Sequence, residues 1–175
     1  MVCYDYRYVS NLPLNNEPEE ILARMLYSFR SSQTNQTYWV IVDKCENDIF
    51  VVKFHLKAHR HSENKYCILT NLHEARSVVY TCLMIIKDEI GAKHPSASIG
   101  FVGASLEGES ERNNKRFRFY SKFVQTHIDL YTYEHFANEE KSAYILIPRK
   151  ALDINPTLPD IYLEMLENYE EHDSL

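Results

Sequence analysis

The sequence predicts an α+β fold: a mixed, mainly antiparallel sheet with a central buried helix, followed by a C-terminal amphipathic acidic helix. Apolar runs of strand length at 38–42, 49–56 and 98–102 predict the sheet. The segment between the last two runs contains a stretch that is apolar around most of a helix, which predicts the buried helix. A chain of 175 residues can bury a core as one domain, which we expect in 1–148, with a linker and the last helix in 149–175.

The N-terminal elements follow from local patterns. Residues 1–16, rich in tyrosine and asparagine, predict an extended arm. Apolar residues at helical spacing predict a first helix over 17–29, with a proline and glutamates in its first turn. A third strand is expected at 66–69. Asn71 then caps the central helix, with Glu74 as the second member of a capping box.

The rest of the chain continues in the same manner. Gly91 and Pro95 are expected to end the central helix. The elements predicted after strand 98–102 are a glycine loop at 103–110, a basic helix at 112–125, closing strands at 130–136 and 143–147, a polar linker at 149–157 and a final helix that starts at Pro159.

The net charge of −6 is unevenly distributed. Residues 160–175 contain six of the 25 acidic residues and no Lys or Arg, so residues 1–159 are neutral. A neutral body argues against tight, non-specific binding to duplex nucleic acid, which requires many phosphate contacts.

The four cysteines lie far apart and form no CxxC pair. Buried free thiols of a cytoplasmic protein fit this spacing better than a structural zinc site. The first residues lack the basic and apolar regions of a signal peptide, and no apolar run reaches the length of a membrane span. We therefore expect a cytoplasmic protein.

All four glycines lie between Gly91 and Gly108, a window that includes the loop after strand 98–102. This loop approaches the phosphate-binding pattern G-x-x-x-x-G-K-[ST], but Glu109 stands where that pattern has lysine. A carboxylate at this position repels phosphates, which argues against nucleotide hydrolysis. A glycine-rich exit from a buried strand is the alternative interpretation.

The helix after this loop is basic and aromatic. Arg112 and Arg116, one turn apart near its start, suit a phosphate or carboxylate ligand. Interleaved basic and aromatic residues also suit single-stranded nucleic acid. An ordinary solvated basic face is the third interpretation. The expected ligand contacts in loop and helix are Gly103, Ser105, Gly108, Arg112, Asn114, Arg116, Arg118 and Lys122.

The spacing of three histidines raises the question of a metal site. His55, His59 and His61 share one parity and would point to the same side of a continuous strand, as metal ligands do. Their surroundings look like a loop, however, so we expect exposed histidines and no metal.

The last helix carries an apolar stripe and an acidic face. It either folds back on its own domain, or docks another chain or a second copy. Its acids could also cover the basic helix as a lid or within a dimer. The expected partner interface consists of Ile161, Tyr162, Met165, Leu166 and Tyr169.

The order of the predicted elements resembles the fold of the Gcn5-related N-acetyltransferases. The segment Asn113-Asn114 with Arg116-Phe-Arg-Phe-Tyr120 looks like the Asn-, Arg- and Tyr-containing helix of that family. The resemblance covers about residues 17–147. It implies acetyl-coenzyme A as cosubstrate and Tyr120 as the general acid for the leaving thiolate, with Glu74 or Glu107 as base.

The family's pyrophosphate motif, R/Q-x-x-G-x-G/A, corresponds here to residues 69–77, which lack glycine. Side chains there would block the approach of pyrophosphate to the backbone, so the resemblance implies the fold more than the activity. The chain also looks like small proteins of Bacteroidota with a similar Gly…Arg-x-Arg-x-Tyr stretch, which implies a bacterial source.

These patterns favour a non-catalytic binding or regulatory module without a cofactor. Residues 103–122 would engage an anionic ligand or a protein partner, and the C-terminal helix would mediate assembly. Two alternatives remain open: an acyl-coenzyme A-dependent N-acetyltransferase with an atypical cofactor loop, and a single-stranded nucleic-acid binder.

Overall fold

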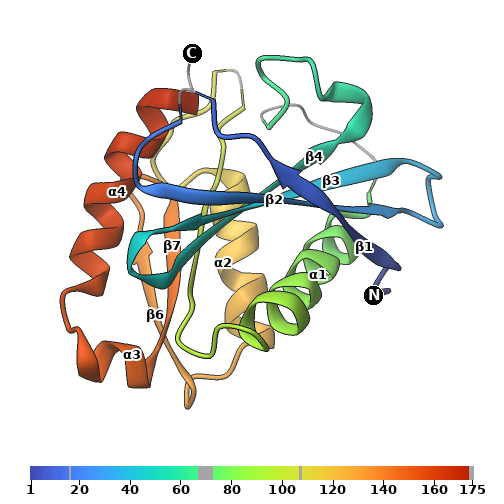
Figure 1. The fold of residues 1–175 in the computed structure, drawn as a ribbon. Helices are drawn as coiled ribbons and strands as arrows, with labels where there is room; N and C mark the ends of the chain where they lie inside the picture. The colour runs from blue at the N-terminus through green and yellow to red at the C-terminus, as the bar shows by residue number, and fades with distance from the viewer. Residues whose placement is uncertain (16, 67–72, 107, 174–175) are drawn as a thin grey trace.

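The chain forms a seven-stranded sheet with helices packed against both faces (Figure 1). This computed structural model describes residues 1–15, 17–66, 73–106 and 108–173. The strands are β1 (Tyr6–Leu12), β2 (Ile21–Arg30), β3 (Thr37–Cys45), β4 (Ile49–Leu56), β5 (Ser98–Val102), β6 (Tyr133–Asn138) and β7 (Ala143–Pro148). The α-helices are α1 (Ala75–Ile85), α2 (Lys115–His127), α3 (Arg149–Ile154) and α4 (Leu158–Asp173).

The strands lie in the order β1-β2-β3-β4-β5-β7-β6. Among the described strands, β4 and β5 form the one parallel pair, and the other neighbours are antiparallel. The connection from β4 to β5 runs through α1, as a crossover between parallel strands requires. The predicted α+β class with a mainly antiparallel sheet is confirmed.

The predicted helix over 17–29 is wrong, because this segment forms β2. It pairs with β3 from Ile21 opposite Cys45 to Arg30 opposite Thr37. The predicted arm contains β1, which pairs with β2 from Tyr6 to Leu12. The sequence pattern misleads here because residues 26–29 are buried on both faces of the sheet, which removes the alternation of apolar and polar residues that normally marks a strand.

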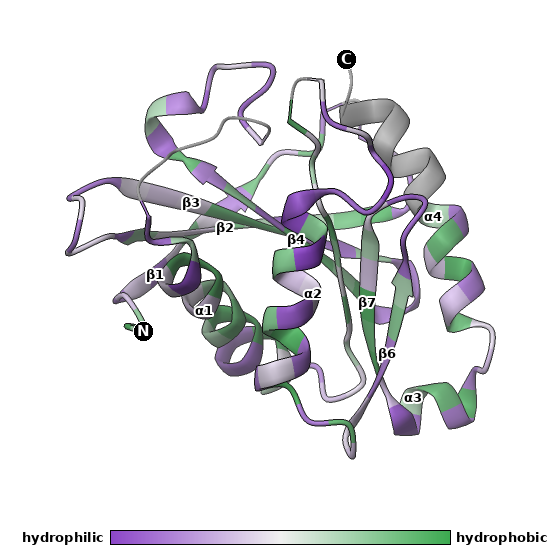
Figure 2. Cartoon of the chain, turned by 180° about the vertical axis from the view of Figure 1, so that it is seen from behind, coloured by the Kyte–Doolittle hydropathy of each residue, from purple (hydrophilic) through white to green (hydrophobic). Residues whose placement is uncertain are grey.

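Two hydrophobic cores lie on opposite faces of the sheet. The larger contains the buried side of α1 and α2, and Figure 2 views the molecule from that side. The smaller contains α4 together with side chains from β4 and β7. Along β7 the side chains alternate: Tyr144 and Leu146 belong to the first core, and Ile145 and Ile147 to the second.

α1 is the expected buried helix. It continues into a π-helical turn, η3 (Ile86–Gly91), so Gly91 does mark its end. The expected capping box depended on Asn71, which lies outside the described residues, and Glu74 makes no side-chain cap. The expected strand at 66–69 likewise falls mostly outside them.

α4 folds back on its own domain. The ring of Tyr162 is 1% exposed, and its hydroxyl donates to the Tyr144 carbonyl oxygen at 3.1 Å. A Cβ on Gly100 would come within 2.5 Å of that ring, so glycine at this position lets α4 approach β5.

This packing corrects three expectations about the C-terminal segment. Tyr162 and Met165 are buried in the second core instead of forming the expected partner interface, and Ile161 packs against that core. The side chains of Leu166 and Tyr169 lie outside the described ones. The basic helix and α4 belong to opposite faces of the sheet, so the described part of α4 does not cover the basic helix. Finally, the expected linker contains α3.

Candidate functional site

The sheet opens into a cleft between β4 and β5. The two strands pair only at Ile49–Ser98, Phe50–Ile99 and Val51–Gly100. Beyond Val51, β4 stays with β3, while β5 stays with β7. A cavity of about 480 Å³ occupies the gap, a volume typical of small-molecule sites.

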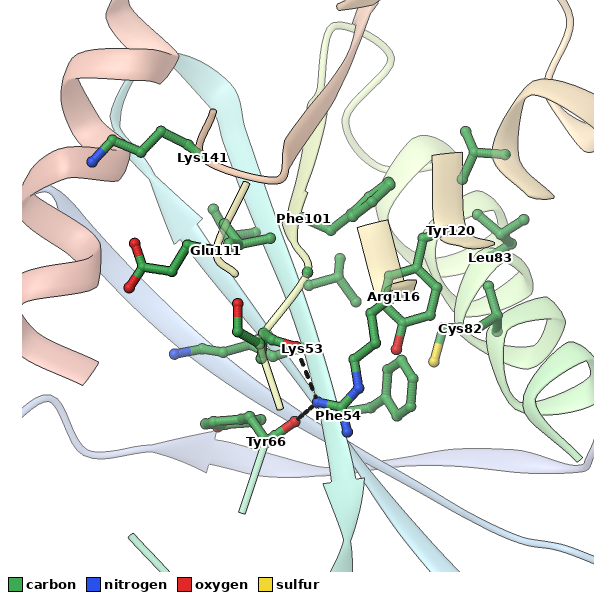
Figure 3. Close-up of a pocket in the computed structure, with 18 of the residues that line it drawn as sticks. Lys53, Phe54, Tyr66, Cys82, Leu83, Phe101, Glu111, Arg116, Tyr120 and Lys141 are labelled. Carbon is green, nitrogen blue, oxygen red and sulfur yellow. Dashed lines mark hydrogen bonds between the residues drawn. The ribbon is translucent and has the colours of Figure 1, made fainter. Parts of the chain in front are cut away.

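This cavity has an apolar end and a charged end. The apolar end is formed by side chains of β4, α1, η3, β5 and α2: Phe54, Val79, Cys82, Leu83, Ile86, Phe101, Tyr120 and Val124. The charged residues of the lining are Lys53, Glu63, Glu111, Arg116 and Lys141. In Figure 3, Glu111 and Lys141 lie on one side of Arg116, and Tyr120, Cys82 and Leu83 lie on the other.

Tyr120 brings a hydrogen-bonding group into the apolar end. Its hydroxyl points toward Cys82 (Figure 3) and has no hydrogen-bond partner in the described part of the chain. Burial raises the pKa of Tyr120 to about 12, so the hydroxyl is protonated at neutral pH. A protonated, unpartnered hydroxyl in a cavity is a donor for a ligand.

Arg116 spans the cleft. Its guanidinium donates to the carbonyl oxygens of Tyr66 and Ala104, the latter at 3.5 Å (Figure 3). These carbonyls belong to the segment after β4 and to the segment after β5. Arg116 therefore ties together the two walls that diverge beyond the parallel pairing.

Gly103 allows the first turn of α2 to sit against the end of β5. A Cβ there would lie 2.7 Å from both Asn114 Oδ1 and the Phe117 amide nitrogen. Asn114 is the N-cap: its Oδ1 accepts from the Phe117 amide at 2.9 Å, and its Nδ2 donates to the Gly103 carbonyl. Gly103 and Asn114 thus have a structural role.

The start of α2 already holds an anionic group. The Glu109 carboxylate accepts from the backbone amides of Lys115, at 2.8 Å, and Leu106, at 3.2 Å. These bonds lower the pKa of Glu109. The helix N-terminus where an external anion was expected is therefore satisfied by the chain itself. The candidate site is therefore the cavity and not this corner.

The other basic residues expected there lie outside the cavity lining. Arg112 forms an exposed ion pair with Glu140 at 3.2 Å, and Arg118 donates to the Asn113 carbonyl. Lys122 is exposed. Of the expected ligand contacts, the cavity therefore includes Gly103, Ser105 and Arg116 and excludes Gly108, Arg112, Asn114, Arg118 and Lys122.

Glu74, one expected base, lies elsewhere. It is 3% exposed, and its carboxylate accepts from the hydroxyls of Tyr4, Ser31, Thr34 and Tyr38. Burial acts to raise its pKa, but the four hydrogen bonds together lower it. This carboxylate joins the N-terminal segment, the β2–β3 turn and α1, so its role is structural. Glu107, the other expected base, lies outside the described residues.

The histidines do not gather around a common point. His55 is buried, contrary to expectation, with Nδ1 2.8 Å from the Leu56 carbonyl oxygen, whereas His61 is exposed. Across the described ranges, no three His, Cys, Asp or Glu side chains form a group that could hold a metal ion. Nor does any described helix combine the length and apolar character of a membrane span.

Sequence reasoning missed the residues contributed by β4 and by the segment after it. Lys53 lies 3.6 Å from the buried Asp43 carboxylate and 5.2 Å from the centre of the Tyr66 ring. Neither residue belongs to a recognisable motif. The available signal was the strand–helix–strand order of 49–102, because ligands bind at the carboxyl ends of parallel strands where neighbours diverge.

The fold and cavity define an α+β protein with a ligand-sized cleft at the carboxyl ends of its parallel strands. Comparison of the chain with protein-family models gives no match. Searches of curated proteins and of solved structures find no significant similarity either. The function is therefore inferred from the cleft alone.

Proposed function

We propose that the cleft binds an acyl thioester of coenzyme A and that the protein is an N-acyltransferase. The observation that carries this proposal is the divergence of β4 and β5 around a cavity into which Tyr120 points. The strand order, with α1 between the two parallel strands, supports the acetyltransferase-like fold.

The cavity suits an extended ligand with amide groups. Beyond Val51, the edge of β4 is no longer paired with β5, and an extended chain can lie along such an edge. The segment corresponding to the pyrophosphate motif includes residues 67–72, which the structure does not describe. The fit therefore concerns the acyl and amide portions of the ligand.

The proposed chemistry assigns one role to this chain. The nitrogen of an amine attacks the thioester carbon, the carbon–sulfur bond breaks, and the amine loses a proton to solvent. The sulfur leaves as a thiolate beside the Tyr120 hydroxyl, which passes it a proton and is reprotonated by solvent. The raised pKa of Tyr120 keeps this hydroxyl protonated at neutral pH, so it is available as the donor.

Tyr120→Phe tests this role. We expect the variant to bind coenzyme A as the wild type does, measured by calorimetry, and to lose about 10²- to 10⁴-fold in kcat. Turnover is followed as free thiol released from acetyl-coenzyme A with a panel of primary amines. Tyr80→Phe is the matched control, because Tyr80 lies outside the cavity lining. Absence of binding by any coenzyme A species would refute the proposal.

A non-catalytic binding module is the second candidate. It is favoured by the sequestration of Glu74 and by the lack of glycine in 69–77. The same experiment separates the two: binding of coenzyme A species without turnover across the amine panel supports the module. The nucleic-acid alternative depends on the exposed bases of α2, and salt-dependent binding to a single-stranded oligonucleotide tests it.

A further inference from the structure

The apolar end of the cavity extends beyond what an acetyl group needs. Its walls are contributed by α1, through Val79, Cys82 and Leu83, by Ile86 of η3, and by Phe101 and Val124 from the facing elements. The side chains of Val79, Cys82 and Leu83 are 5–8% exposed, so this part of the cavity lies within the molecule.

The direction of α1 gives this end its depth. α1 follows the connection from β4. Together with η3 it carries Val79, Leu83 and Ile86 along one side, one turn apart, into the first core. The cavity therefore continues from the gap between the strands to the space between the sheet, α1 and α2. Among the described residues, the polar side-chain groups in this space are the Tyr120 hydroxyl and the Cys82 thiol.

The Cys82 thiol does not change this character. Burial raises its pKa well above the ordinary value, so it remains neutral and acts as a small apolar group. The charged groups of the lining are Lys53 of β4, Glu63, Glu111 of the loop before α2, Arg116 of the first turn of α2, and Lys141. A ligand in this cavity thus meets apolar walls on the side of Tyr120 and charge on the other side.

We propose that this end holds the acyl group of the thioester, and that the preferred acyl group is a medium-length aliphatic chain and not acetyl. This inference rests on the proposed function. Two carbon atoms would leave most of the apolar wall without contacts, and an apolar cavity offers water few partners. Each additional methylene group that enters it gains hydrophobic free energy.

A chain-length series measures this preference. Calorimetry with coenzyme A and its acetyl, butyryl, hexanoyl and octanoyl thioesters is expected to show about fourfold tighter binding per added methylene group, until the end is filled. An affinity that is flat or falls from acetyl to octanoyl, while coenzyme A itself binds, would overturn the inference and leave the proposed function intact.

Truncated thioesters separate the two proposals. S-acyl-N-acetylcysteamines carry the same acyl chains without phosphate groups. If these compounds bind more tightly as the acyl chain lengthens, while coenzyme A esters do not bind, the acyl-chain inference stands and the coenzyme A assignment fails. If neither series binds, both fail.

Variants of the wall locate the chain. Leu83→Phe shortens the apolar end and is expected to shift the preference by several methylene groups toward shorter chains, whereas Val79→Ala extends it. Val78→Ala is the matched control, because Val78 is a neighbouring buried residue of α1 outside the lining. An unchanged preference in both Leu83→Phe and Val79→Ala would place the chain elsewhere and refute the assignment.

Discussion

Gly103→Ala is the substitution whose effect the structure defines most closely. The added Cβ would lie 2.7 Å from Asn114 Oδ1, 2.7 Å from the Phe117 amide nitrogen and 2.9 Å from the Phe117 Cβ. The Phe117 amide nitrogen is a backbone atom and the Phe117 Cβ is fixed by the backbone. Rotation of a side chain therefore cannot relieve the overlap. The first turn of α2 must move away from β5.

The expected cost combines two terms. Overpacking in a closed site costs about 1–3 kcal/mol, and loss of the Asn114 cap adds about 1 kcal/mol. A total of about 2–4 kcal/mol corresponds to a fall in melting temperature of about 5–15 °C for a chain of this size. Because Arg116 and Tyr120 belong to the displaced helix, binding in the cavity should weaken as well.

Urea unfolding followed by circular dichroism measures this cost. Gly91→Ala is the matched control, since its Cβ would lie 3.6 Å from the Ile86 carbonyl oxygen, an ordinary contact. We expect this control to change the free energy of unfolding by less than about 1 kcal/mol. If Gly103→Ala is as stable as Gly91→Ala, the close contact between β5 and α2 does not exist, and the geometry of the site is wrong.

Three other predictions concern the frame around the site. Glu74→Gln should lower the free energy of unfolding by about 1–3 kcal/mol, because an amide accepts fewer of the four hydroxyl hydrogen bonds. The lowered native pKa of Glu74 stabilises the wild type above the unfolded-state pKa of about 4.3. This stabilisation is lost as pH falls through the native pKa. The free energy of unfolding in urea should therefore fall less steeply with decreasing pH in the variant than in the wild type. Tyr162→Phe should cost about 1 kcal/mol by the same assay, through the bond to the Tyr144 carbonyl. Removal of 158–175 uncovers the second core and should abolish cooperative thermal unfolding, whereas unchanged unfolding would show that α4 is dispensable.

The strands at 38–42, 49–56 and 98–102 could be predicted from the sequence, because each is a continuous apolar run between polar turns. The same rule fails for β2. Its apolar residues at 21, 22, 25, 26 and 29 match helical spacing, and burial of both faces of the sheet conceals the strand period. Pairing with β1 and β3, which depends on residues distant in sequence, decides the outcome.

The candidate site could be predicted in part. The glycine loop and basic helix do border the cavity, and Arg116 and Tyr120 do enter it. The anion-binding role assigned to the corner depended on an open helix N-terminus. Whether a helix N-terminus is open cannot be seen in the sequence, because it depends on where Glu109 folds back, and the loop places that carboxylate on the Lys115 amide.

The cavity itself depends on how two strands distant in sequence pair with each other, which no single segment determines. Beyond Val51 and Gly100, β4 remains paired with β3 and β5 with β7, while β4 and β5 no longer pair with each other. Strand alternation and helix spacing determine which side chains line the gap between the two strands. A ligand site can thus arise from sheet topology with no local motif. The lack of glycine in 69–77 argues against the pyrophosphate-binding motif of the acetyltransferases, but it does not affect the shape of this cleft.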